Sequence, residues 1–158
     1  MRGKTELVAQ SRTFMDIALD EARQAAARGE VPVGAVLVCH GDIVARDGNR
    51  TVEHNDPSAH AETLVIRQAC NLAQSQRLPD HDLYVTLEPC ALCAAIISFA
   101  RIRRLYFGAS DAKSGGVLHG GQFFQQATCH HAPEVYPGIA EAEAGDVLRN
   151  FFAGKRGR

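Results

Sequence analysis

The sequence lacks three features that would place it in particular classes of protein. No apolar run approaches the ~18 to 20 residues that a membrane-spanning helix requires, so we expect no membrane segment. The opening residues Met1 to Lys4 lead into neither an apolar core nor a small-residue cleavage site, which argues against a secretory signal. The net charge is only −1, so the chain has no global basic field like that of dedicated nucleic-acid-binding proteins, although a local basic patch is compatible with it.

The cysteines exclude a further class. There are five of them, an odd number, and two stand in a Cys-x-x-Cys pair. A framework of disulfides is therefore not expected, and a reducing compartment suits the chain better, so we predict a cytoplasmic location. Cys39 and Cys70 lie on apolar faces and are expected to be buried spectators.

What is present is the composition of a globular protein, with 46% hydrophobic and 22% charged residues. A chain of 158 residues is long enough to bury a full core and has the usual size of one domain. It contains no internal repeat, linker or low-complexity segment. We therefore predict a single domain over residues 1–158, in which the polar and aperiodic residues 1–10 form a flexible tail.

Apolar periodicity and turn residues predict helices that alternate with strands. The predicted helices cover residues 11–28, 59–73, 90–100 and 139–152, and the predicted strands cover 33–39, 43–46, 82–87 and 105–108. Ser11 is the expected N-cap of the first helix and Gly29 its expected end. The first two strands form an antiparallel hairpin, whereas strands joined through helices imply right-handed crossovers and parallel pairing. The pattern indicates an α/β fold with a mixed sheet and helices on its faces.

Two short motifs carry the chemistry, His60-Ala61-Glu62 and Pro89-Cys90-Ala91-Leu92-Cys93. One imidazole and two thiolates are ligands that zinc prefers, and three protein ligands leave the open position that marks a catalytic zinc site. Each ligand set falls at the start of a predicted helix, where unpaired N–H groups and the helix dipole favour thiolate over thiol. His60, Cys90 and Cys93 are therefore the predicted ligands of a zinc ion.

This arrangement favours hydrolytic removal of an amine from a nucleobase. A zinc ion with an open position lowers the pKa of a bound water from ~15.7 toward ~7, which makes a nucleophile available at neutral pH. Glu62 lies two residues after His60 and is the predicted proton shuttle, since it can transfer protons beside the metal without binding it. The pattern His-x-Glu followed by Pro-Cys-x-x-Cys is the signature of zinc nucleobase deaminases.

A structural zinc site is the main alternative to a catalytic one. It would need a fourth ligand, for which Cys129, His130 and His131 are candidates, and it would leave Glu62 without a role. A Cys-x-x-Cys pair on its own is also compatible with a redox function. The presence of Glu62 favours the catalytic interpretation.

Several other positions allow more than one interpretation. Asn49 fits either a turn or a contact to the rim of a purine. Glu88 is interpreted as a residue that caps or braces the helix that follows it. The glycine pairs between 115 and 121 bracket a region that we expect to be mobile, and His119 is expected in a solvated loop.

Nearly the whole chain, from about Phe14 to Lys155, resembles the bacterial tRNA-specific adenosine deaminases of the cytidine deaminase-like superfamily. The matching segments are residues 31–35, 48–50, 55–62, 86–93, 100–102 and 107–113. The two zinc motifs identify the superfamily. Asp111-Ala112-Lys113 and the Phe151-Phe152 end with its basic tail are similar to the tRNA branch in particular.

The resemblance implies a three-layer α-β-α fold with a mixed, mostly parallel five-stranded sheet. It implies a cytoplasmic homodimer with one Zn²⁺ per subunit, which converts adenosine to inosine at the wobble position of a tRNA anticodon stem-loop. It places Asn49 against the flipped base, Asp111 and Lys113 near the anticodon-loop backbone, and Arg156 at a further RNA contact. A flipped loop base that enters a small pocket while a few basic residues hold phosphates requires no large net charge.

Two other functions remain to be distinguished from this one. Guanine deaminases share the run Asn-Asp-Pro-Ser-Ala-His-Ala-Glu and a Glu-Pro-Cys motif, and they would need a pocket for a free base and no RNA groove. A more distant alternative is an RNA-binding module in which zinc is structural and no catalysis occurs.

Overall fold

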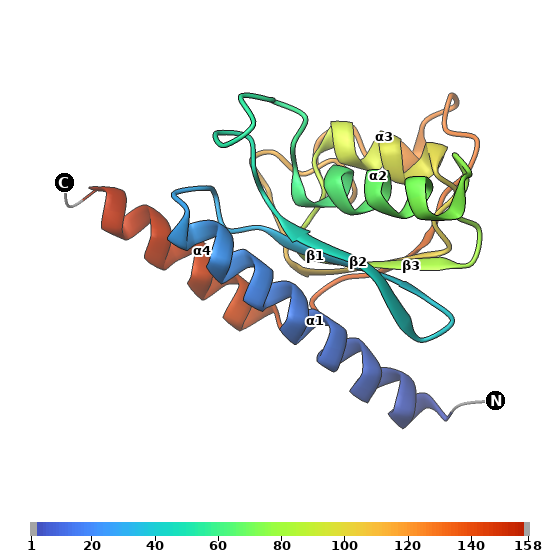
Figure 1. Ribbon diagram of the computed structural model, residues 1–158, viewed down its shortest axis with the longest axis horizontal. Coiled ribbons are helices and arrows are strands. Elements are labelled where there is room, and N and C mark those ends of the chain that lie inside the picture. The colour runs from blue at the N-terminus through green and yellow to red at the C-terminus, as the bar shows by residue number, and fades with distance from the viewer. Residues whose placement is uncertain (1–2, 157–158) are drawn as a thin grey trace.

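The computed structural model describes residues 3–156, without the side chains of residues 7 and 156, and shows helices on both faces of one sheet (Figure 1). In chain order the elements are α1 (Lys4–Ala27), β1 (Gly34–Cys39), β2 (Asp42–Gly48), α2 (Ala61–Ala73), β3 (His81–Leu87), α3 (Ala91–Phe99), β4 (Arg104–Ala109), the 3-10 turn η1 (Phe123–Gln125), β5 (Glu134–Tyr136) and α4 (Glu141–Arg156). No helix in this described part is long and apolar enough to cross a membrane.

The sheet has five strands in the order β2-β1-β3-β4-β5. β1 pairs antiparallel with both β2 and β3, whereas β3, β4 and β5 pair in parallel. β1 therefore runs against the other four strands, because the hairpin returns β2 on its outer side and the α2 crossover returns β3 on its inner side. The mixed sheet implied by the resemblance is confirmed.

Helices α1 and α4 cover one face of the sheet, and α2 and α3 cover the other (Figure 1). Alternate residues of a strand point to opposite faces, and β3 shows this directly. Leu83 and Val85 belong to the core beneath α2 and α3, whereas Tyr84 belongs to the core beneath α1 and α4. The predicted three-layer architecture is thus confirmed, with a separate apolar core on each face.

The N-terminal part of the chain differs from the prediction. Residues 4–10 are not an aperiodic segment but the first turns of α1, and Ser11 is buried within that helix rather than capping it. These turns bury little side-chain surface, with Val8 65% exposed, so they carry no apolar periodicity that the sequence could reveal. Residues 1–2 of the predicted tail lie outside the described residues.

Strand β5 is absent from the sequence prediction, which placed only apolar anchors in an irregular segment there. It has three residues and lies at the edge of the sheet beside β4, where Tyr136 stacks on Tyr106 with 4.8 Å between ring centroids. Three residues are too few for an alternating pattern to stand out. Gly29, with a positive φ of 85°, directly follows the Arg28 C-cap of α1, as predicted for the end of that helix.

Candidate active site

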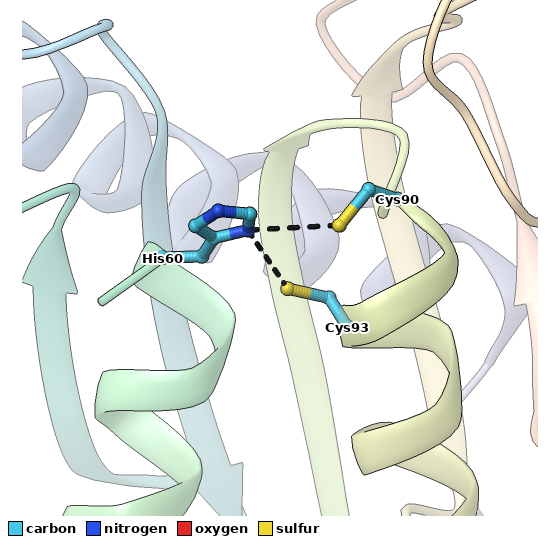
Figure 2. Close-up of side chains that lie close together, drawn as sticks. All are labelled: His60, Cys90 and Cys93. Carbon is cyan, nitrogen blue, oxygen red and sulfur yellow. Dashed lines mark hydrogen bonds between the residues drawn. The ribbon is translucent and has the colours of Figure 1, made fainter. Parts of the chain in front are cut away.

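The three predicted zinc ligands meet where α2 and α3 begin. His60 is the N-cap residue of α2, Cys90 is the N-cap residue of α3, and Cys93 lies in the first turn of α3. Figure 2 shows the imidazole of His60 directed across the gap between the helix starts toward both sulfur atoms. Because α2 and α3 lie side by side on one face of the sheet, residues thirty positions apart converge on one point.

The spacing of the ligand atoms suits a zinc ion. The Nδ1 atom of His60 lies 3.3 Å from the Sγ atom of Cys93 and 3.6 Å from that of Cys90. Bond lengths of ~2.1 Å to nitrogen and ~2.3 Å to sulfur in tetrahedral geometry separate such atoms by about 3.5 Å. The donor set and its spacing therefore fit zinc, as predicted.

The site favours ionised sulfur even before a metal binds. Hydrogen bonding from Cys93 and from His60 lowers the pKa of the Cys90 thiol to about 4, although burial opposes this shift. Hydrogen bonding to Cys90, together with burial, raises the pKa of Cys93. The two sulfurs thus share one proton, and a bound cation would favour loss of that remaining proton.

Glu62 lies beside these ligands, and its carboxyl group is buried with an incomplete set of hydrogen bonds. It is only 4% exposed, and its Oε1 atom has no hydrogen-bond partner among the described residues. Burial raises the pKa of this carboxyl to about 6. A buried carboxylate oxygen without a hydrogen-bond partner destabilises the folded state, so a contribution to folding does not explain its presence. A pKa close to neutrality suits a group that transfers protons.

A structural zinc site would need a fourth protein ligand, and the described residues supply none beside the other three. In the described part of the chain, His60, Cys90 and Cys93 are the only group of three or more His, Cys, Asp or Glu side chains with convergent ligand atoms. Cys129 and His131 are engaged elsewhere: the Cys129 thiol donates to the His131 carbonyl at 3.1 Å, and the His131 ring donates to the Ile102 carbonyl at 2.7 Å. The site therefore keeps the open position expected for catalysis.

Comparisons with known proteins agree with this geometry. The family model of the cytidine and deoxycytidylate deaminase zinc-binding region matches residues 8–109, which contain all three ligands. A tRNA-specific adenosine deaminase of Agrobacterium fabrum is 60% identical over 149 residues, which are 94% of this chain and 98% of that protein. The chain belongs to the tRNA-specific adenosine deaminase family.

Solved structures place the chain in the same family. One, from work on A-to-I editing by tRNA:A34 deaminases at the wobble position of transfer RNA, has 62% identity and a TM-score of 0.85, and the match covers 86% of this chain and 99% of that chain. A guanine deaminase of Bacillus subtilis has 28% identity and a TM-score of 0.62, with 91% and 92% covered. The chain is thus more similar to the tRNA:A34 deaminase in sequence and in structure.

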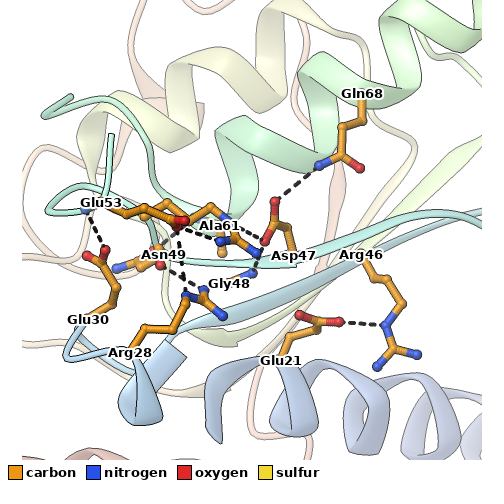
Figure 3. A network of polar contacts seen from close by, with 11 residues as sticks. Glu21, Arg28, Glu30, Arg46, Asp47, Gly48, Asn49, Glu53, Ala61 and Gln68 are labelled. Atoms are coloured by element: carbon orange, nitrogen blue, oxygen red, sulfur yellow. Dashed lines mark hydrogen bonds and ion pairs between the residues drawn. The ribbon is translucent and has the colours of Figure 1, made fainter. Parts of the chain in front are cut away.

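In this family member Asn49 has a definite structural role. Its Oδ1 atom accepts a hydrogen bond of 2.9 Å from the backbone N–H of Ala61, the residue between His60 and Glu62 (Figure 3). The loop after Asn49 is held by the buried Glu30, which accepts backbone hydrogen bonds from residues 52 and 53. Asn49 therefore fixes the first residue of α2, which directly follows the predicted ligand His60.

The other predicted substrate contacts lie in two further segments. Asp111 follows β4, and its carboxylate accepts backbone N–H bonds from Lys113 and Ser114, so it shapes a turn that leaves the Lys113 side chain exposed. Arg156 is the last residue of α4, and its side chain lies outside the described residues.

Glu88 makes contacts in the structure that its position in the sequence did not predict. It does not cap α3, as its position suggested, but binds the segment from 111 to 119, and His119 is its partner rather than a free loop residue. The glycine pairs between 115 and 121 were expected to bracket a mobile region, but residues 115–117 are buried. A charged residue between a buried strand and a metal motif, in a chain with glycine pairs further on, was the available signal.

The predicted spectator cysteines stay outside the site. Cys39 ends β1 and Cys70 lies in α2, and both are half-buried rather than fully buried. Neither belongs to the group of convergent ligand atoms. The convergent group thus contains the two predicted ligand cysteines and neither of the predicted spectators.

Proposed function

We propose that this chain hydrolyses adenosine to inosine at the wobble position of a tRNA anticodon. The relatives named above support the substrate, at 60% and 62% identity. The observation that carries the chemistry is the buried carboxylate of Glu62 beside a three-ligand metal site, with an Oε1 atom that has no hydrogen-bond partner among the described residues. An enzyme needs this arrangement, whereas a structural zinc site does not.

His60, Cys90 and Cys93 would hold the zinc ion, one per subunit, by their Nδ1 and Sγ atoms. When bound, the ion lowers the pKa of a coordinated water and supplies a nucleophile near neutral pH. The oxygen of water adds at C6 of adenine, the bond from C6 to the exocyclic nitrogen breaks, and ammonia leaves. Glu62 transfers one proton of the water to the ring nitrogen and the other to the departing amine.

RNA recognition is proposed for residues around this pocket. The Asn49 carbonyl oxygen already accepts from Ala61, so its amide nitrogen is the part that can donate to a flipped base. Lys113 is exposed on the turn that Asp111 shapes, where its ammonium group can reach a phosphate. Arg156 extends the proposed RNA contact to the end of α4.

We also propose that two copies of the chain form a homodimer through α3. Leu92 and Phe99 are 44% and 67% exposed, and they share one face of the helix with the half-buried Ile96. An uncovered apolar stripe beside an active site is typical of an interface. Phe99→Asp should shift the mass in light scattering from dimer to monomer, whereas Val8→Asp, at an exposed valine of α1, should not. A monomeric wild type would refute the dimer.

The described residues build one sheet with a core on each face, which supports a single deaminase domain over residues 1–158. A tRNA substrate and five unpaired cysteines support a cytoplasmic location.

The proposal is tested with two substrates in parallel. The purified protein is incubated with an anticodon stem-loop that carries adenosine at the wobble position, and separately with free guanine, and inosine, xanthine and ammonia are measured. We expect inosine in the RNA with one ammonia per inosine. Xanthine from guanine with unchanged RNA would make the chain a guanine deaminase, and the absence of both products in zinc-loaded protein would refute catalysis.

A further inference from the structure

The Glu88 carboxylate is saturated by donors from a single distant segment. Its Oε1 atom accepts from the backbone N–H of Asp111 at 3.0 Å and from the His119 ring at 2.8 Å. Its Oε2 atom accepts from the backbone N–H groups of Val117, Leu118 and His119 at 3.2, 3.0 and 3.1 Å. The side chain is fully buried, so all these bonds form away from water.

Two glycines allow the segment to close over this carboxylate. A Cβ atom on Gly115 would lie 2.3 Å from the Glu88 Oε2 atom, and one on Gly116 would lie 2.6 Å from the backbone nitrogen of Ala91. Gly116 also donates its backbone N–H to the Pro89 carbonyl at 2.8 Å. The segment therefore touches both the carboxylate and the first residues of the zinc-bearing helix, and neither glycine leaves space for a side chain.

The middle of the segment is tied to the metal-binding turn, and its first residues carry the proposed RNA contacts. Gly115 forms a β-bridge with Cys90, a zinc ligand. The turn at Asp111 and Lys113 begins at Asp111, and the backbone N–H of Asp111 donates to the Glu88 carboxylate. A shift of the segment would thus move Lys113 relative to the metal site, and it would reach the ligands only through the backbone at Cys90.

We infer that Glu88 is a positioning residue that holds residues 111–119 against the start of α3 and so sets the distance between the RNA-contacting turn and the metal site. This inference rests on the proposed function. Glu88 lies one residue beyond the end of β3, and the strand anchors it in the sheet. The carboxylate is needed because only an anion with two accepting oxygens can satisfy both groups of donors.

The test disturbs the contact from each side. Glu88→Gln turns an NH2 group toward backbone N–H donors, and Gly115→Ala forces the segment away from the carboxylate. Each has a matched control away from the contact. Asp82→Asn removes a buried carboxylate at the opposite end of β3, where it binds Arg103. Gly121→Ala adds a methyl group where no atom lies within 4 Å.

Three quantities are measured on the zinc-loaded full chain: bound zinc by mass spectrometry, amide hydrogen exchange of residues 111–119, and kcat and KM on the anticodon stem-loop. We expect both test variants to keep zinc, to exchange these amides faster, and to lose about tenfold or more in kcat/KM, mainly through KM, as for a lost charged contact to RNA. Both controls should match the wild type in exchange and in KM.

Two outcomes would overturn the inference. Unchanged exchange in Glu88→Gln would show that the carboxylate does not hold the segment, and faster exchange with unchanged KM would show that its position does not set RNA affinity. A wild type that is inactive on the stem-loop would instead refute the proposed function, and the exchange measurement would still decide whether Glu88 holds the segment.

Discussion

Glu62 and Glu88 are both buried, with 4% and 2% of their surface exposed, and each lies close in sequence to a predicted zinc ligand, Glu62 after His60 and Glu88 before Cys90. Their surroundings are opposite. Glu88 accepts five hydrogen bonds, whereas the Oε1 atom of Glu62 has no partner among the described residues. Burial alone therefore does not reveal a functional carboxylate, and an incomplete set of hydrogen-bond donors around it is the more informative sign.

The acidity of the two carboxyls follows from this difference. Burial raises the pKa of Glu62 to about 6, so this group can accept and release protons near neutral pH. Burial also opposes ionisation of Glu88, but hydrogen bonds from Asp111 and His119 outweigh it and hold the pKa of Glu88 below its usual value. Glu88 remains an anion, which suits a residue that holds a loop and transfers no proton.

The largest effect should come from removing the metal that gives Glu62 its function. His60→Ala, Cys90→Ala and Cys93→Ala should each lose zinc and all activity, because two ligands remain where three converge. Cys39→Ala and Cys70→Ala should keep both. Metal content by mass spectrometry decides, and zinc loss in either of the last two variants would overturn the ligand assignment.

The next effect concerns stability and sets the two glutamates apart. Glu88→Gln should lower the free energy of unfolding by about 3 kcal/mol, because it leaves buried N–H groups facing an amide. Glu62→Gln should not lower it, since it removes a buried charge that lacks a full set of partners. Urea unfolding of the metal-free proteins measures both values. Equal losses of unfolding free energy in the two variants would contradict the proposed difference between the two carboxylates.

The smallest effect is a pH dependence at Glu30, a second loop-holding carboxylate that lies away from the metal. Burial opposes its ionisation, but backbone hydrogen bonds from Val52 and Glu53 outweigh burial and lower its pKa. Its contribution to stability is therefore present above the unfolded pKa of ~4.3 and lost as the pH falls through the lower folded value.

Glu30→Gln should accordingly cost about 2 kcal/mol at pH 7, and the difference from wild type should shrink as the pH falls below ~4. Unfolding in urea at a series of pH values measures it. Asp20→Asn is the control, since the ion pair of Asp20 with Arg23 is exposed and should contribute little at any pH. A difference that grows toward acid pH would contradict the assignment.

The sequence predicted the layers of the fold and the metal ligands because both depend on local patterns. His60 and Cys93 stand at helix starts that caps and prolines reveal, and strands such as β3 reveal themselves by apolar runs. The first turns of α1 and the three residues of β5 bury too little surface to leave a periodic pattern.

The function of Glu88 could not be read from the sequence for a different reason. Its partners are 23 to 31 residues away, in an irregular segment without periodicity. Only the fold shows that β4 returns the chain beside β3 and so brings Asp111 to the carboxylate. The glycines of that segment indicated a turn, but whether they allow motion or close packing depends on what lies opposite them.

We propose that Glu62 transfers the protons of a deamination reaction, and the rate of the Glu62→Gln variant tests this role. Single-turnover conversion of the anticodon stem-loop is measured on zinc-loaded protein, together with zinc content and thermal unfolding. We expect a folded variant with a full complement of zinc and a rate reduced by about 10²- to 10⁴-fold. A zinc-loaded Glu62→Gln variant that produces inosine at the wild-type rate would contradict it.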